Sequence, residues 1–151
     1  MRTVLFVCTG NTCRSPMAEA IARHAIDRGL LGPDAGVFVA SAGVHASPGA
    51  RPTRETIIAL AEHDIEVDGS STPLSAPMIL KADVVLCMTE AHAQAARAMV
   101  ADSPGDQAKI QRLDPAGDLE DPIGLGQEAY DALAQQLMEL IPRRLKEVLV
   151  P

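Results

Sequence analysis

Residues 7–16 read Val7-Cys8-Thr9-Gly10-Asn11-Thr12-Cys13-Arg14-Ser15-Pro16. The run that leads into this stretch, residues 3–8, is continuously apolar or β-branched, which is typical of a strand covered on both faces. Ser15 is a favourable helix N-cap and Pro16 suits the first helical position, so a helix is predicted from about Pro16 to Arg28. The stretch therefore predicts a strand, a short loop and a helix in immediate succession.

Strand and helix signals alternate along the rest of the chain. We expect strands at residues 37–42 and 83–88, a weaker one at 109–113, and helices at 53–63, 74–81, 90–100 and 127–149. Pro142 falls inside the last helix and should kink or break it near Met138. Residues 114–126 hold two prolines and three glycines and should form a loop. Such alternation predicts an α/β fold, a parallel sheet with helices on both faces, in which ligands bind at the carboxyl ends of the strands.

The loop after the first strand has the features of an anion site. Five residues separate Cys8 from Arg14, enough to wrap around one tetrahedral anion. Gly10 and Asn11 tolerate backbone conformations that most residues avoid, so successive amides can point inward as a nest. The following helix adds its positive N-terminal end, and Arg14 adds a planar fork for two phosphate oxygens.

The same field acts on Cys8, because a helix N-terminus and a nearby arginine favour the thiolate. A thiolate below a bound phosphoryl group is an in-line nucleophile, and the expected course is a phosphocysteine intermediate that water hydrolyses. Ser15 Oγ is expected to hydrogen-bond the sulfur as it leaves. The residues expected to bind phosphate are Thr9, Gly10, Asn11, Thr12, Cys13 and Ser15.

Composition narrows the remaining classes. The 151 residues suit one domain, spanning 1–151, and the net charge of −7 argues against a nucleic-acid partner. No apolar run approaches 18 residues and no signal peptide is evident, so we expect a cytoplasmic protein without a membrane span. Three cysteines are too few for a four-cysteine zinc site, and the four histidines are scattered and are interpreted as surface or core-edge residues. No metal or organic cofactor is expected.

Phosphoryl transfer also needs a proton donor for the leaving group. Two Asp-Pro pairs compete for this role, Asp114-Pro115 and Asp121-Pro122. Both are also ordinary turn openers. Chemistry alone does not choose between them.

The quoted stretch resembles the signature of the low-molecular-weight protein tyrosine phosphatase family. Ser41-Ala42-Gly43, residues 82–88 and Asp121-Pro122 are similar to further segments of that family. The resemblance implies a four-stranded parallel sheet of order 2-1-3-4 and Asp121 as general acid. Asp118 would then shape the acid loop, and Asp114 would be structural.

One feature of the family is missing. Members often place a histidine before the third strand, where it hydrogen-bonds the asparagine of the phosphate loop, and Gly69 stands near that position here. We expect Asn11 to be held instead by Ser41 and by the backbone or Ser71.

The substrate is expected to be a phosphorylated protein, with inorganic phosphate as product. The family's tyrosine phosphatases usually wall the phenol ring with aromatics, but the segments after Gly43 and Pro122 contain none. Thr12 resembles the threonine of a bacterial branch, the protein-arginine phosphatases. We therefore hypothesise phosphoarginine, recognised with help from Asp121 and Asp118, and keep phosphotyrosine as the alternative.

Two rival classes are less consistent with the sequence. Arsenate reductases of this fold use further cysteines after the third strand, whereas Cys87 lies inside that strand and no cysteine follows it. A phosphate-binding module without activity would not need Cys8, Arg14 and an acid loop together. Cys13 is either a packing residue or a resolving thiol that forms a protective disulfide with Cys8.

Overall fold

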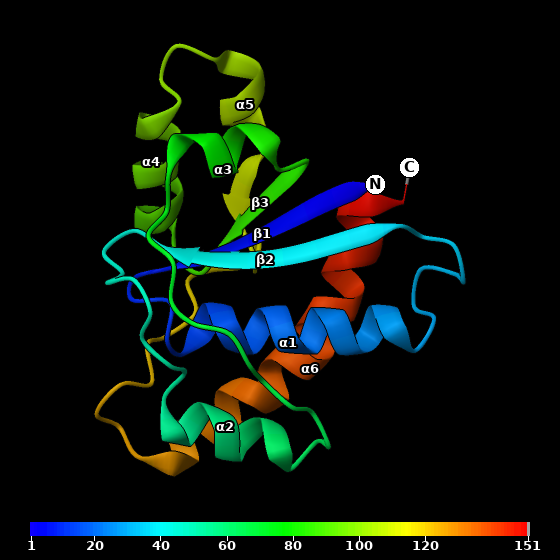
Figure 1. Ribbon diagram of the computed structural model, residues 1–151, viewed down its shortest axis with the longest axis vertical. Coiled ribbons are helices and arrows are strands. Elements are labelled where there is room, and N and C mark those ends of the chain that lie inside the picture. The colour runs from blue at the N-terminus through cyan, green and yellow to red at the C-terminus, as the bar shows by residue number, and fades with distance from the viewer. Residues whose placement is uncertain (151) are drawn as a thin grey trace.

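The computed structural model describes residues 1–150. Its four parallel strands form one sheet in the order β2-β1-β3-β4, which confirms the expected topology (Figure 1). The strands are β1 Arg2–Cys8, β2 Val37–Gly43, β3 Val84–Cys87 and β4 Ile110–Arg112.

Helices cover both faces of this sheet, again as expected (Figure 1). The helices are α1 Arg14–Asp27, α2 Arg54–Ala61, α3 Ala76–Lys81, α4 Glu90–Met99, α5 Pro104–Ala108 and α6 Gln127–Leu149. In Figure 1, α1, α2 and α6 lie below the sheet, while α3, α4 and α5 lie above it. Alternate residues of β1 point into two separate apolar clusters, Val4 and Phe6 into one and Leu5 and Val7 into the other, as a strand buried on both faces requires.

The strand register brings three loops to one edge of the sheet. Cys8 at the end of β1 pairs with Gly43 at the end of β2, and Val7 pairs with Cys87 at the end of β3. The loop after β1 therefore lies between the segment after Gly43 and the start of α4. This is the carboxyl edge at which the sequence predicts the site.

Two local expectations need correction, the helix cap at Ser15 and the break at Pro142. The first helix begins at Arg14 with Cys13 as N-cap residue, so Ser15 lies inside the helix and does not cap it. The last helix continues through Pro142 without a break. Its apolar positions on both sides of the proline, such as Leu137, Ile141 and Leu145, are buried in one cluster, and this packing holds the two halves together.

Two helices also differ from expectation in detail. Helix α5 was not predicted, although Ser103-Pro104 is a typical helix start. Helix α2, expected over residues 53–63, spans Arg54–Ala61 and buries Thr56, Ala59 and Leu60. The polar side chain of Thr56 can be buried because its hydroxyl makes hydrogen bonds, which are described below.

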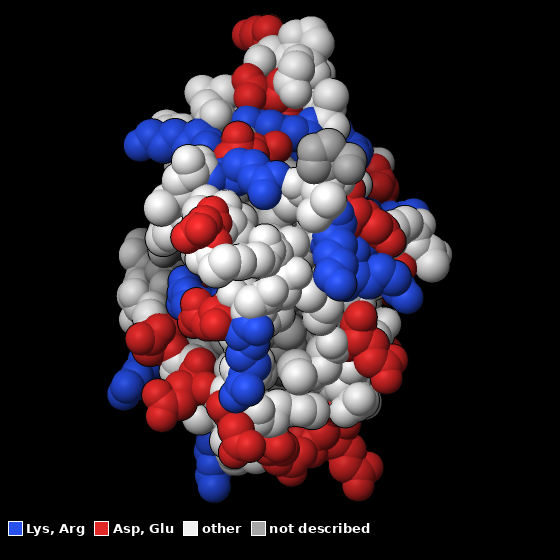
Figure 2. Space-filling model, turned by 90° about the vertical axis from the view of Figure 1, so that its right-hand side faces the viewer, with Lys and Arg blue, Asp and Glu red and all other residues white. Residues whose placement is uncertain are grey.

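The surface carries charges of both signs. On the face shown in Figure 2, acidic and basic side chains are interspersed, so neither sign dominates that face. No helix within residues 1–150 has the length and apolar character needed to cross a membrane.

Candidate active site

The loop after β1 folds back so that its own backbone contacts the sulfur of Cys8. Asn11 adopts the left-handed conformation, with φ of 57°, and its amide N–H donates to Cys8 Sγ at 3.2 Å. Ser15 Oγ lies 2.8 Å from the same sulfur. Cys8 is only 2% exposed, so these two groups are its immediate polar environment.

The side chain of Asn11 determines the direction of these bonds. Its Oδ1 accepts from the backbone N–H of Thr72 at 2.9 Å, so its Nδ2 faces Ser15 Oγ and Ser41 Oγ, at 2.8 and 2.9 Å. Nδ2 can only donate, so Ser15 accepts from it and has its own proton free for Cys8 Sγ. The hydroxyl of Ser15, placed in the first turn of α1, is thus a donor to the sulfur.

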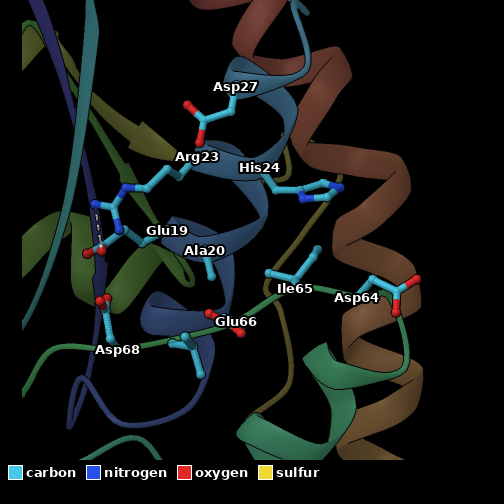
Figure 3. A pocket seen from close by; sticks show the side chains of 10 residues that line it. Glu19, Ala20, Arg23, His24, Asp27, Asp64, Ile65, Glu66 and Asp68 are labelled. Atoms are coloured by element: carbon cyan, nitrogen blue, oxygen red, sulfur yellow. Dashed lines mark ion pairs between the residues drawn. The ribbon is translucent and has the colours of Figure 1, made fainter.

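Behind the loop, Ser41 continues the network. Its hydroxyl donates to Glu19 Oε1 at 2.8 Å, and Glu19 Oε2 lies 3.1 Å from Arg23 Nη2. Figure 3 shows this ion pair at the edge of a pocket of about 330 Å³ between α1 and residues 64–68. The expected support of Asn11 by Ser41 and by backbone is confirmed.

Of the two alternatives offered besides Ser41, the backbone and Ser71, the structure uses the backbone N–H of Thr72. The Ser71 hydroxyl donates to Ser47 O and accepts from the backbone N–H of Ala50. Gly69, where the family often has histidine, lines a groove of about 230 Å³ that also includes Asn11. Asn11 is therefore held by the backbone of Thr72 and by serine hydroxyls, without a histidine. Gly69, which has no side chain, leaves the groove open at the position where the family often has that histidine.

Gly43 allows the end of β2 to approach the phosphate loop closely. A Cβ at this position would lie 2.5 Å from Thr9 O and 2.9 Å from Asn11 N. Real structures do not show such contacts, so only glycine fits here. The Ser-Ala-Gly motif thus contributes one hydroxyl and one close backbone approach to the loop.

Helix α2 supports the other side of the loop. The carbonyl of Thr12 accepts from Thr53 N at 2.9 Å and from Thr56 Oγ1 at 3.4 Å. The hydroxyl of Thr12 makes only a long contact among the described residues, 3.8 Å to Cys13 Sγ. The hydroxyl of this half-buried residue is therefore not committed to a strong protein bond. Sequence reasoning missed Thr56, because the favourable N-cap residue Thr53 indicates the helix start but not the role of the Thr56 hydroxyl.

Arg14 is a buried charged residue that is held between two loops. It is 5% exposed, its Nη1 donates to Leu119 O at 2.9 Å, and its Nη2 lies 3.4 Å from Thr9 Oγ1 and 3.5 Å from Asp121 Oδ2. Leu119 is itself fixed by a bond from its N–H to Met88 O. The guanidinium is thus fixed in place, and it joins the first loop to the acid loop.

The three candidate carboxylates differ in their contacts. Asp121 is 43% exposed, lies beside Arg14, and accepts from the N–H of Ile123 in a local turn. Asp118 accepts from the N–H of Glu90 at the start of α4 and lies 3.7 Å from Arg112 Nη1. Asp114 accepts from the N–H of Ala116 within its own turn. The geometry therefore places Asp121 at the site and gives Asp118 and Asp114 loop-forming contacts.

The structure adds His92, which we interpreted from the sequence, like the other histidines, as a surface or core-edge residue. It lies in the first turn of α4, and its Nε2 is 2.8 Å from Thr9 Oγ1. Burial, and after it the positive charge of Arg14, lower the pKa of His92 to about 4. The imidazole is therefore neutral near pH 7.

The other two cysteines have different surroundings, and all three are free thiols. Cys13 Sγ lies 3.5 Å from the hydroxyl of buried Tyr130, and burial, then the Cys13 contact, raises the pKa of Tyr130 to about 12. Burial raises the pKa of the Cys87 thiol to about 12, as suits a core residue within β3. Among residues 1–150, no three His, Cys, Asp or Glu side chains are grouped so as to hold a metal ion.

Nearly the whole chain matches a known family. The sequence model of the family described as low molecular weight phosphotyrosine protein phosphatase matches residues 3–149. The chain belongs to this family. It is accordingly a cysteine-dependent phosphoprotein phosphatase, and the resemblance inferred from residues 7–16 is confirmed.

Individual relatives of the family cover nearly the full length. The protein-arginine-phosphatase of Bacillus subtilis (strain 168) is 37% identical, over 96% of this chain and 95% of the relative. The low molecular weight protein-tyrosine-phosphatase PtpB of Staphylococcus haemolyticus is 32% identical, over 91% of this chain and 94% of the relative. A solved mutant of the arginine phosphatase YwlE, with a phosphorylated active-site serine, superimposes with a TM-score of 0.85 at 36% identity, over 96% of both chains.

Proposed function

We propose that the protein hydrolyses phosphoarginine in proteins, with Cys8 as nucleophile, Arg14 as phosphate clamp and Asp121 as general acid. In the first step Cys8 Sγ attacks phosphorus, and the bond from phosphorus to the guanidine nitrogen breaks. Asp121 gives its proton to that nitrogen as the bond breaks, so the guanidine does not leave as an anion and Asp121 becomes a carboxylate. The 3.5 Å distance between Asp121 Oδ2 and Arg14 Nη2 supports this role, because an acid that close to the clamp can reach the leaving group of a phosphoryl group that the clamp binds.

The second step regenerates the enzyme. The Asp121 carboxylate takes a proton from water, the water oxygen attacks phosphorus, and the bond from sulfur to phosphorus breaks to release inorganic phosphate. The leaving thiolate is stabilised by the Ser15 hydroxyl at 2.8 Å and the Asn11 N–H at 3.2 Å. Donors that are fixed before the charge forms need no reorganisation, which lowers the barrier.

The observation that carries the choice of phosphoarginine is the absence of an aromatic wall. The chain has three aromatic residues. Phe6 and Tyr130 are buried in the core, and Phe38 lies near the start of β2, whereas the site lies at its end. No Phe, Tyr or Trp is therefore placed to stack on a phenol ring at the site.

Thr12 supports the same choice. Its hydroxyl lies in the phosphate loop without a strong protein partner, so it can hydrogen-bond the attacking water or the leaving group. The protein-arginine-phosphatase of Bacillus subtilis, 37% identical, is consistent with this proposal. The similarity to a tyrosine phosphatase at 32% identity keeps phosphotyrosine as the second candidate.

A side-by-side assay on phosphoarginine and phosphotyrosine peptides of the same sequence tests the substrate. We expect kcat/KM to be higher for phosphoarginine, and a higher value for phosphotyrosine would refute the preference. The variant Thr12→Ile should shift the ratio towards phosphotyrosine by about tenfold, since it exchanges a hydroxyl for an apolar surface. An unchanged ratio would remove Thr12 from the specificity argument.

The nucleophile needs a separate control. Cys8→Ser should abolish turnover of a generic aryl phosphate while phosphate binding persists, because Arg14 and the loop amides remain. Retained turnover would show that Cys8 is not the nucleophile. A wild-type protein that binds aryl phosphate without turning it over would instead be a phosphate-binding module.

A further inference from the structure

His92 is held firmly next to the site but has no role in the steps above. Helix α4 begins directly after β3, and Thr89 caps it by accepting from the backbone N–H of His92 at 3.2 Å. Side chains of a first helical turn lean towards the helix N-terminus, and here that direction leads to the phosphate loop. His92 is 6% exposed, so its ring has little access to water.

The ring contacts the residue that contacts Arg14. His92 Nε2 lies 2.8 Å from Thr9 Oγ1, and Thr9 Oγ1 lies 3.4 Å from Arg14 Nη2. Arg14 is always a donor, so Thr9 accepts from it. The orientation of the Thr9 hydroxyl then depends on which ring nitrogen of His92 carries the proton.

The other ring nitrogen decides this question. His92 Nδ1 is buried and, within residues 1–150, it has no hydrogen-bond partner. The neutral ring has one N–H, and a buried N–H without a partner is rarer in proteins than an acceptor without one. The proton therefore belongs on Nε2, where it has an acceptor 2.8 Å away.

We propose that His92 is a positioning residue of the phosphate site, which donates from Nε2 to Thr9 and thereby fixes the Thr9 hydroxyl oxygen as an acceptor for Arg14. The Thr9 oxygen then receives two donors, which occupy both of its lone pairs. Its own proton points away from both, and at this exposed residue it is a donor for an acceptor at the mouth of the site. With Leu119 O on its other side, the guanidinium of Arg14 is fixed for two-point binding of phosphate.

A matched pair of variants tests this role. The amide nitrogen of glutamine reaches about as far as Nε2, whereas that of asparagine reaches about as far as Nδ1. We expect His92→Asn to raise the inhibition constant of inorganic phosphate and to lower kcat/KM for an aryl phosphate, each by about tenfold, as for a lost hydrogen bond. His92→Gln should stay within about threefold of the wild type, and equal losses in both variants would overturn the proposal.

A double variant tests the path through Thr9. Thr9→Val removes the hydroxyl at nearly constant volume, so adding His92→Asn should then change phosphate inhibition by less than about twofold. Losses that multiply would show that His92 does not act through Thr9. Nitrogen-15 NMR of the wild-type imidazole supplies a readout that needs no variant: the proton is expected on Nε2, and a proton on Nδ1 would refute the proposal.

The inference rests on the proposed role of Arg14, and the two can fail separately. A wild-type protein that does not bind inorganic phosphate would contradict the role of Arg14 and with it this inference. Phosphate binding that is the same in the wild type and in His92→Asn would contradict the role of His92 alone.

Discussion

Neutral His92 should make the stability of the protein depend on pH in a way that one substitution removes. Burial and the charge of Arg14 lower its pKa from 6.5 to about 4, against weaker opposing effects of Asp118 and Asp121, while His45 adds to the lowering. Below pH 6.5 the unfolded chain takes up a proton on this residue, but the folded chain does not do so until about pH 4. The contribution to stability is therefore complete above pH 6.5 and is lost as the pH falls towards 4.

The size of this loss follows from the two pKa values. Each pH unit inside the window lowers the free energy of unfolding by about 1.4 kcal/mol, so the whole window is worth about 3 kcal/mol. Between pH 7.5 and pH 5, which avoids extreme acid, the loss is about 2 kcal/mol. The variant His92→Gln does not titrate and should not show this loss.

Urea unfolding of the wild type and of His92→Gln, at several pH values from 7.5 to 5, measures the effect. Groups other than residue 92 titrate alike in both proteins, so the difference between the two free energies isolates His92. We expect the free energy of unfolding of the wild type minus that of the variant to fall by about 2 kcal/mol from pH 7.5 to pH 5. A difference that stays constant with pH would refute the buried, neutral histidine, and a rise on acidification would show that the folded state prefers the imidazolium.

Three further predictions concern the loop and its surroundings. Gly43→Ala should lower the free energy of unfolding by about 2 kcal/mol and reduce activity, because its Cβ would meet backbone at 2.5 Å; the control Gly105→Ala meets no atom within 4 Å, and urea unfolding should show no loss. Ser15→Ala should slow hydrolysis of the phosphoenzyme about tenfold more than its formation, because its hydroxyl stabilises the leaving thiolate. Stopped-flow traces of an aryl phosphate should then show a burst of the released phenol. Equal slowing of both steps would contradict the role of the Ser15 hydroxyl. Peroxide should inactivate the enzyme reversibly through a Cys8–Cys13 disulfide, detected by mass spectrometry, and Cys13→Ser should make the loss irreversible; a wild type that thiols do not reactivate would exclude this disulfide.

The central fold could be predicted because its signals are local. An apolar run before residue 8, Gly10 and Asn11 inside the loop, and a helix start after it determine one strand, one loop and one helix. The left-handed φ of Asn11 is an example of a backbone feature expected from residue type alone. The strand order, in contrast, came from family resemblance, since periodicity does not determine which strands are neighbours.

Several of the errors concern side chains that serve partners outside their own helix. Ser15 was predicted as the N-cap, but its hydroxyl is used for Cys8 Sγ and Asn11 Nδ2, and Cys13 is the N-cap residue instead. Thr56 was not singled out from the sequence, yet its hydroxyl reaches the carbonyl of Thr12, 44 residues away. His92 lies 83 residues from Thr9, and only the register of β1 and β3 brings the two together.

The acid loop was predictable only in part. Two Asp-Pro pairs were equivalent by chemistry, and family resemblance chose Asp121. The contacts that distinguish them, Arg14 beside Asp121 and the turn of Asp114, depend on how the loop folds over the sheet edge. No local pattern in residues 114–126 encodes this.

The dense bonding behind the phosphate loop restricts how enzymes of this architecture can diverge. Asn11, Ser15 and Arg14 each serve several partners, so a substitution at any of them disturbs binding, chemistry and packing at once. The hydroxyl of Thr12 and the exposed side chains of Ile123 and Leu125 have no such obligations. New leaving-group preferences can therefore arise by exchanging a few outward-facing side chains while the phosphate-handling parts are inherited unchanged.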